Sequence, residues 1–271
     1  MQNVLFETIK QLPPLPASIV KIEAIYHDPD SSFQEMAKVL ETDPLLTADI
    51  LKAANSPLYG FSREMTSIPQ VVSLFGMGTI RGFALASMVS KSFELNLSPY
   101  GISNEQFSSL ATTQHALITR WYQKTEPKLL ELLSPATFLV ETGKVLLAQC
   151  LIKEEKTEAF RAEANECSDL EALERSYCDA DTPEVSAAIF DHWRFENELI
   201  NIIKYSCAPE NAPEAVKKAA QSLQAVRVAV PVDGVITDKS IDAAKELINR
   251  YGLDEASFES ALNNIKEQLP S

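Results

Sequence analysis

The sequence contains few of the residues that build phosphate-binding loops, metal centres and tight strand turns. Its 271 residues include eight glycines, four cysteines and three histidines. No glycine-rich nucleotide loop and no Gly-x-Ser-x-Gly nucleophile motif is present. The cysteines form no CxxC pair, which favours reduced thiols in a cytoplasmic protein. Scarce glycine and little strand-like alternation together indicate an all-α fold.

Positive charge is also in short supply. Lys and Arg total 24 against 38 Asp and Glu, so the formal net charge is −14. That balance repels a phosphate backbone, and no run of five or more basic residues offsets it, so we expect no nucleic-acid partner. The N-terminus has no basic and apolar regions of a secretory signal, and no apolar run approaches the roughly 18 residues that span a bilayer. We therefore expect no membrane partner and a cytoplasmic location.

What the sequence does contain is a succession of amphipathic helical patterns with recognisable ends. Asp43-Pro44 is typical of an N-cap followed by proline at the first helical position, and Ser31 or Ser32 can cap the helix at 33–41. Gly76 and Gly252 are typical of helix stops. Other helices are predicted at 17–26, 79–93, 103–123, 136–152, 157–165, 169–177, 183–193, 195–206, 213–229, 240–251 and 254–268.

These patterns divide into three regions. Residues 1–98 form a predicted N-terminal helical lobe, and the segment Leu97-Ser-Pro-Tyr-Gly101 is the first credible boundary. Residues 99–230 form a second helical lobe. Residues 231–271 form a C-terminal helical extension, which either packs back on the core or mediates self-association.

Three motifs in the first hundred residues resemble the HDOD (HD-related output domain) family in order and spacing. They are Leu12-Pro-Pro-Leu-Pro16, the stretch from Asp43 to Gly60, and Ser67-Ile-Pro-Gln-Val-Val-Ser-Leu-Phe-Gly76. The resemblance implies a multi-helix bundle in two lobes, related to HD-domain metal-dependent phosphohydrolases but usually without their metal ligands. It further implies a bacterial signal-transduction or regulatory output module.

The resemblance also implies a degenerate hydrolytic site. Where the phosphohydrolases carry a His-Asp pair before Gly-Lys, this chain has Val140-Glu141 before Gly143-Lys144. The other expected ligand positions fall at His115, Thr182, Ser206 and Cys207. Because working metal sites offer three or more protein ligands, we expect no metal, no cofactor and no catalytic residue here. The surviving Gly143-Lys144 is interpreted as helix geometry in the core.

A candidate recognition surface lies at the end of the second motif. There Asn55, Ser56 and Tyr59 can form a polar rim for a partner, with Asn55 in the left-handed conformation. The alternative is a helix stop and a packing corner. Two further histidine motifs are interpreted as structural: His27-Asp28 lies in a turn, and His192 lies near a helix C-terminus, where it favours the helix dipole.

Three functions remain open. The leading hypothesis is a non-catalytic module that binds a protein partner of a signalling pathway in the groove between the two lobes. The second is a sensor for a nucleotide or cyclic dinucleotide in the relict pocket, with Lys144, Arg120 and Lys124 supplying positive charge. The third is a residual metal-dependent phosphohydrolase.

Overall fold

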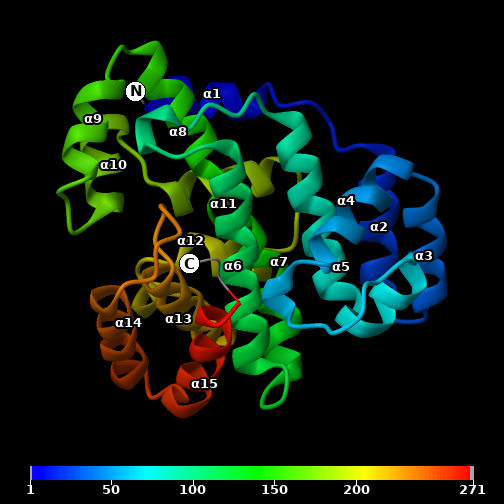
Figure 1. The fold of residues 1–271 in the computed structure, drawn as a ribbon. Helices are drawn as coiled ribbons and strands as arrows, with labels where there is room; N and C mark the ends of the chain where they lie inside the picture. Colours follow the sequence, from blue (N-terminus) through cyan, green and yellow to red (C-terminus); the bar gives the residue numbers. More distant parts are fainter. Residues whose placement is uncertain (1, 269–271) are drawn as a thin grey trace.

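The regular structure of residues 2–268, which the computed structural model describes, is entirely helical (Figure 1). The first hundred residues form α1 (Gln2–Lys10), α2 (Ala17–His27), α3 (Phe33–Glu41), α4 (Pro44–Ala54), the 3-10 turn η1 (Pro57–Tyr59), α5 (Ile68–Ser92) and η2 (Ser98–Tyr100). The prediction of an all-α fold is confirmed.

The second half continues with helices only. Its elements are α6 (Asn104–Tyr122), α7 (Pro127–Leu139), α8 (Gly143–Lys153), α9 (Thr157–Ala164), α10 (Leu170–Cys178), α11 (Thr182–His192), α12 (Asn197–Lys204), η3 (Pro209–Asn211), α13 (Glu214–Ala229), α14 (Asp238–Tyr251) and α15 (Glu255–Lys266).

Several helices begin and end at the residues that the sequence predicts. Ser32 closes a capping box with Glu35, and the Asp43 carboxylate accepts the Leu46 amide at 3.0 Å. Gly252 ends α14 in the left-handed region, with φ of 65°. Gly76 has φ of 77° and ψ of 167°, so α5 bends sharply there, as expected for a stop between two helices. These ends follow from local hydrogen bonding and glycine conformational freedom.

The turn after α4 differs from the prediction. Asn55 has φ of −86° and is not left-handed, and Gly60 takes that conformation instead, with φ of 69°. The Asn55 amide nitrogen donates to the carbonyl of Met65 at 2.9 Å, and its amide oxygen accepts the Met65 backbone N–H at 2.8 Å. The Asn55 side chain thus links the end of α4 to the segment around Met65. A prediction from backbone preferences alone does not include such a side-chain contact.

The predicted single helix at 136–152 is wrong, because α7 ends at Leu139 and α8 begins at Gly143. The hydroxyl of Ser186 on α11 accepts the Gly143 N–H and donates to the Val140 carbonyl, both at 2.7 Å. These two bonds satisfy backbone groups at the break, so a side chain from a distant helix stabilises the turn.

The packing of the helices joins the regions that the sequence divides. Helix α5 packs against α2, α3 and α4 on one side and against α7 on the other, so it connects the two lobes. Helix α1 lies against α8 and α11 of the second lobe (Figure 1). In the C-terminal extension, α14 packs on α13 and α15 on α6, and the Trp121 indole donates to the Asp254 carbonyl. The extension therefore packs back on the core.

Two helical stretches, Ile68–Ser92 and Pro127–Lys153, are long and apolar enough to cross a membrane by composition alone. Within the fold, however, 61% and 83% of their most apolar windows are buried. Their hydrophobicity is therefore accounted for by the protein interior.

Helices α8 and α11 approach each other closely at Gly143. A methyl group at this position would meet the Thr182 carbonyl oxygen and would lie 2.9 Å from the backbone nitrogen of Ser186. Both neighbours are backbone atoms of α11, so neither can rotate away. This close approach explains why glycine stands before Lys144.

We expect Gly143→Ala to lower the free energy of unfolding by about 1–3 kcal/mol, the usual cost of overpacking a core. The direction of the change is informative. Alanine is favoured over glycine inside helices by about 1 kcal/mol, so helix propensity alone would predict that Gly143→Ala increases stability. Urea denaturation measures the change. Unchanged or increased stability would show that the two helices separate without cost.

Candidate functional site

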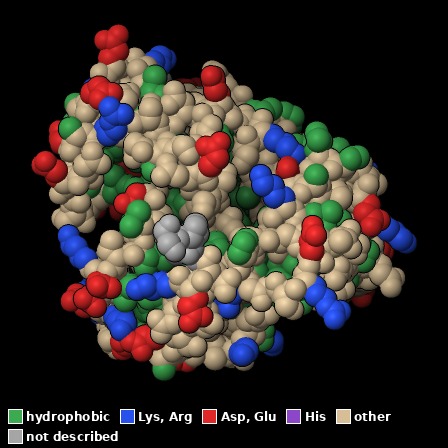
Figure 2. Space-filling view, in the orientation of Figure 1, with side chains coloured by type: hydrophobic (Ala, Val, Ile, Leu, Met, Phe, Trp, Pro, Cys, Tyr) green, Lys and Arg blue, Asp and Glu red, His purple; other side chains and the backbone are tan. Residues whose placement is uncertain are grey.

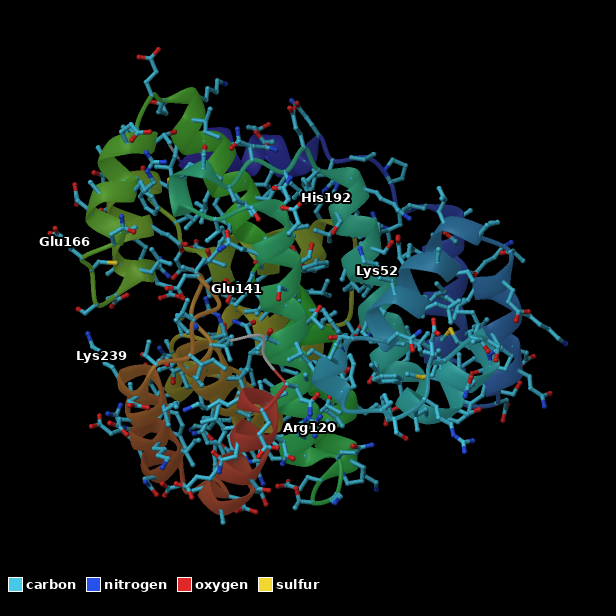
Figure 3. All side chains as sticks on the ribbon, in the orientation of Figure 1. Lys52, Arg120, Glu141, Glu166, His192 and Lys239 are labelled. Atoms are coloured by element: carbon cyan, nitrogen blue, oxygen red, sulfur yellow. The ribbon has the colours of Figure 1, made fainter. Side chains whose placement is uncertain are left out.

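Glu141 lies buried at the turn between α7 and α8. Its Oε1 atom accepts from Arg227 Nε at 2.7 Å, and its Oε2 atom lies 3.0 Å from Lys144 Nζ. Arg227 comes from α13, so the carboxylate links segments that are 86 residues apart in the chain. Figure 3 shows Glu141 between these helices, in the interior of the second lobe.

Lys144 extends the same set of contacts to α10. Its ammonium donates to Glu174 Oε1 at 3.2 Å and to the Thr182 hydroxyl at 3.0 Å. Glu174 also accepts from the Tyr100 hydroxyl at 2.9 Å and from the Thr182 hydroxyl and amide, both at 2.7 Å. Four donors therefore surround one fully buried carboxylate, yet burial outweighs them and raises the pKa of Glu174 above its ordinary value.

Arg227 completes the arrangement. Beyond Glu141, it donates through Nη2 to Glu171 at 2.7 Å and through Nη1 to the Cys207 sulfur. We call Glu141, Lys144, Glu171, Glu174 and Arg227 the ion cluster.

For Glu141, Lys144 and Arg227, ion pairing outweighs burial and favours the charged form. Burial alone would raise the pKa of Glu141, but the Arg227 and Lys144 charges lower it to about 2. Burial would lower the pKa of Lys144, yet the Glu141 and Glu174 carboxylates hold it above its ordinary value. The same balance raises the pKa of Arg227. Charged partners at neutral pH are the condition for keeping these groups inside a protein.

A cavity of about 860 Å³ opens beside the ion cluster. Five basic side chains line it, namely Lys144, Arg175, Lys204, Arg227 and Lys239, and so do five acidic ones, namely Glu141, Asp169, Glu171, Asp181 and Asp233. Figure 2 shows blue and red side chains interspersed around the hollow between α9–α10 and α14. The cavity therefore offers no surplus of positive charge.

The structure brings together only some of the predicted positions of the degenerate site. Glu141, Thr182 and Cys207 all contact Lys144 or Arg227. The Val140 side chain is buried in the apolar core, and Ser206 is fully buried. Burial raises the pKa of Cys207 to about 12, so this thiol is protonated near neutral pH and is a poor nucleophile or metal ligand.

His115 does not belong to this group. Its Nδ1 atom lies 2.7 Å from the Tyr59 hydroxyl and its Nε2 atom 2.6 Å from the Ser134 hydroxyl. Its ring stacks on Phe138, with centroids 4.1 Å apart. Burial lowers the pKa of His115 to about 3, so the ring is neutral at pH 7. The expectation that His115 shares a site with Glu141 is corrected, because their side chains pair with different partners.

The donors around Glu141 do not match the needs of the metal that the HD-type phosphohydrolases use. Such a site needs several free histidine and carboxylate ligands around one ion. Here Val140 offers no lone pair, and the carboxylates of Glu141 and Glu174 already contact the ammonium group of Lys144. A divalent ion at this point would lie against two cations.

The predicted polar rim at the end of α4 is also corrected. Tyr59 is only 8% exposed, and its hydroxyl is taken up by His115. The polar atoms of Asn55 bond the backbone of Met65, and Ser56 is half-buried. The packing-corner alternative describes these three residues better.

A groove does lie between the N-terminal elements and the second lobe, with a volume of about 450 Å³. Phe33, Phe61 and Leu74 line one side of it and are 47%, 42% and 44% exposed. Arg120 and Leu130 line the other side. Arg120, labelled in Figure 3, donates through Nε and Nη2 to the Leu58 carbonyl at 3.0 and 2.8 Å. We call this feature the interlobe groove.

The sequence prediction missed the partners of Glu141, although a signal for them exists. Arg227 stands alone in the run Ala225-Val-Arg-Val-Ala-Val230, and Lys144 precedes the run Val145-Leu-Leu-Ala148. Arg81 likewise interrupts an apolar helix. A single cation within an apolar helical run indicates a buried, paired charge.

Comparisons with known proteins agree with this architecture. Residues 12–209 match the HDOD domain family. A crystal structure of a virulence factor from Campylobacter jejuni subsp. jejuni is 30% identical, with 99% of this chain and 100% of that chain covered and a TM-score of 0.59. A candidate signal transduction protein from Marinobacter aquaeolei VT8 is 20% identical, with 97% and 58% covered and a TM-score of 0.71.

An uncharacterized protein of Treponema pallidum (strain Nichols) is 23% identical over 220 residues, which is 78% of this chain. This chain spans 40% of that relative's length.

We expect Arg227→Met to lower the free energy of unfolding by about 3–5 kcal/mol, because it leaves buried carboxylates without their partner. The double variant Arg227→Met/Glu141→Gln should cost less than the sum of its single changes. Lys218→Met is the control, since it breaks an exposed pair with Glu126 and should cost no more than about 1 kcal/mol. Chemical denaturation of wild type, Arg227→Met, Glu141→Gln, the double variant and Lys218→Met measures these five free energies. Strict additivity would contradict the coupling.

His115 should make stability depend on pH. The unfolded chain binds a proton on this ring below its ordinary pKa of 6.5, whereas the folded chain does not until about pH 3. The free energy of unfolding therefore falls as pH falls below 6.5, by up to about 1.4 kcal/mol per pH unit.

Denaturation of wild type and His115→Gln at pH 5.0 to 8.0 tests this expectation. The variant should lack the slope below pH 6.5, and the control His192→Gln should keep it. Equal slopes in wild type and His115→Gln would place the titrating group elsewhere.

Proposed function

The chain belongs to the HDOD family, and from that membership we propose that it is a signalling module that binds a protein partner and does not catalyse a reaction. The observation that carries the proposal is the ion cluster. Lys144 and Arg227 pair with the carboxylates at the position where the related phosphohydrolases would bind their metal.

This pairing argues against hydrolysis for a chemical reason. A metal-dependent phosphohydrolase activates water on a divalent ion held by free ligands. At this site the carboxylate of Glu141 stabilises two protein cations, and among residues 2–268 no imidazole is recorded in contact with it. Removing Lys144 would take the cationic partner from Glu174, and removing Arg227 would take it from Glu171, so the same contacts that stabilise the fold disfavour the catalytic arrangement.

The interlobe groove supports the binding half of the proposal. Three large apolar side chains, Phe33, Phe61 and Leu74, remain between 42% and 47% exposed along it. Arg120 adds a cation beside them, and Glu131 an anion. Aromatic residues and arginine are the residue types enriched at protein interfaces, so this surface is the best candidate for partner recognition.

The cavity beside the ion cluster is less suited to binding a nucleotide. Its basic side chains are matched in number by acidic ones, and the two basic residues of the ion cluster are already paired. Phosphate recognition needs cations that are free to donate to the ligand. We therefore favour a protein partner over a nucleotide or cyclic dinucleotide.

The double variant Phe61→Glu/Leu74→Glu tests the role of the groove. Tagged wild type should recover a specific protein from a lysate of the source organism, and the variant should recover at least about tenfold less, since losing an interface anchor costs about 2 kcal/mol. Quantitative mass spectrometry of the recovered proteins measures the difference.

Val20→Glu/Leu45→Glu is the matched control, because it adds the same charge at apolar positions that are 52% and 70% exposed. It should recover the partner as wild type does. Identical recovery by all three proteins would refute recognition in the groove. The non-catalytic half of the proposal is tested by assaying manganese-dependent hydrolysis of phosphate esters. Activity in wild type that disappears in Glu141→Gln would show that the protein is an enzyme.

A further inference from the structure

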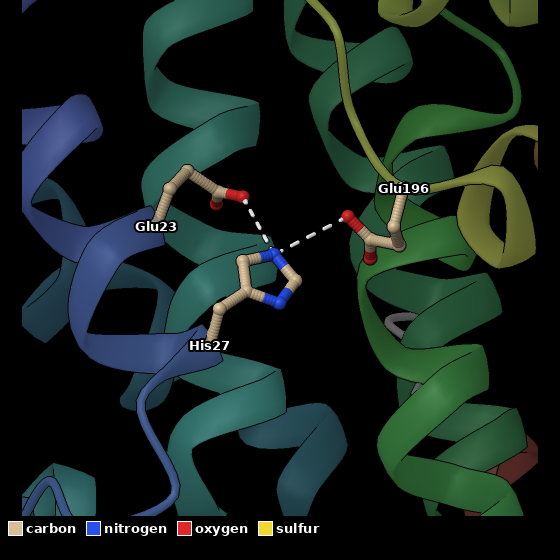
Figure 4. A group of neighbouring side chains, drawn as sticks. All are labelled: Glu23, His27 and Glu196. Atoms are coloured by element: carbon tan, nitrogen blue, oxygen red, sulfur yellow. Dashed lines mark ion pairs between the residues drawn. The ribbon is translucent and has the colours of Figure 1, made fainter.

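A second cluster of charged side chains lies where α2 meets the start of α12. Glu23 and His27 stand four residues apart on α2, and Glu196 occupies the position just before α12 (Figure 4). His27 Nε2 lies 3.7 Å from Glu23 Oε2 and 3.5 Å from Glu196 Oε2. One ligand atom from each of the three residues lies within 4.8 Å of the other two.

The two distances from His27 are close to the edge length of a zinc coordination tetrahedron. Zinc bonds imidazole nitrogen and carboxylate oxygen at about 2.0–2.2 Å, so neighbouring ligand atoms around it are about 3.3–3.6 Å apart. The two distances from His27 lie within about 0.2 Å of that interval. We propose that Glu23, His27 and Glu196 form a binding site for a zinc-class divalent cation, independent of the relict hydrolytic site.

Arg81 orients the two carboxylates of this site. The guanidinium is 1% exposed and donates to both oxygens of Glu23 and both oxygens of Glu196, at 2.6–2.8 Å. Both Oε2 atoms accept from the same Arg81 Nη2 atom, but each carboxylate pairs with one Lys or Arg cation, whereas Glu141 pairs with two. A carboxylate has about four lone-pair sites, so each Oε2 atom can still bond a cation on the side facing His27. Hydrogen bonds that fix a ligating carboxylate are a regular feature of metal sites.

The net charge of this site and its exposure to solvent are also suited to a divalent cation. Two carboxylates and one guanidinium leave one negative charge, which a divalent cation would overcompensate by only one unit. The side chain of His27 is 49% exposed and that of Glu196 is 24% exposed. An ion can therefore reach the site from solvent and keep a water molecule as its fourth ligand.

The position of the site gives the ion a role in the fold. Glu23 and His27 belong to the N-terminal lobe, and Glu196 belongs to the second lobe. Arg81, from α5, already connects them through its hydrogen bonds. A bound cation would add a second bridge at the same place, so metal occupancy would restrain the motion of one lobe against the other.

Isothermal titration of chelator-treated protein with zinc chloride at pH 7.5 tests the site. We expect one zinc per chain in wild type, at least about tenfold weaker binding in His27→Ala, and unchanged binding in the control His192→Ala. Magnesium should not compete, since it prefers six oxygen ligands. In parallel, zinc should shift the NMR resonances of the His27 ring.

The two measurements separate this site from zinc bound by the free cysteines Cys150, Cys167, Cys178 and Cys207. Binding at the thiols would persist in His27→Ala and would leave the His27 resonances in place, and that result would overturn the proposal. Absence of saturable zinc binding in wild type would overturn it as well. Because His27 is half-exposed, its replacement should not unfold the chain.

Discussion

The second lobe depends on one constraint, which is that the buried cations Lys144 and Arg227 must keep their carboxylate partners. Glu141, Glu171 and Glu174 supply them, and together they join the turn before α8 to α10 and α13. An unpaired charge at this depth would cost several kcal/mol. Each of these helices must therefore stay within ion-pair distance of a charged side chain on another helix, which fixes their relative positions.

The same principle recurs between the two lobes. Arg81 is buried on α5 and pairs with Glu23 from α2 and Glu196 from the start of α12. Its guanidinium also lies over the Tyr26 ring, 4.4 Å from the ring centroid. Apolar packing of α5 against α7 provides most of the contact between the lobes. The charged pairs restrict the relative orientation of the lobes, because a bidentate arginine accepts few orientations of its partners.

The contacts of the ion cluster also limit the chemistry that is available at Glu141. A metal site needs polar groups that remain available to an ion and to substrate. In the ion cluster the corresponding groups are consumed by the protein itself, and His115 is neutral inside an aromatic cluster with Phe83 and Phe138. The apolar interlobe groove is also accessible, and contacts made in it do not require a reactive group.

The amino-acid sequence by itself determined the helical class, the helix ends at Asp43 and Gly252, a cap at Ser31 or Ser32, and the presence of Val140-Glu141 before Gly143-Lys144. These features are local, because caps, glycine conformation and side-chain chemistry depend on a few neighbouring residues. Only the tertiary structure decided that Arg227 pairs with Glu141 and that His115 lies apart from both. Such pairings depend on how distant helices pack, which no local pattern specifies.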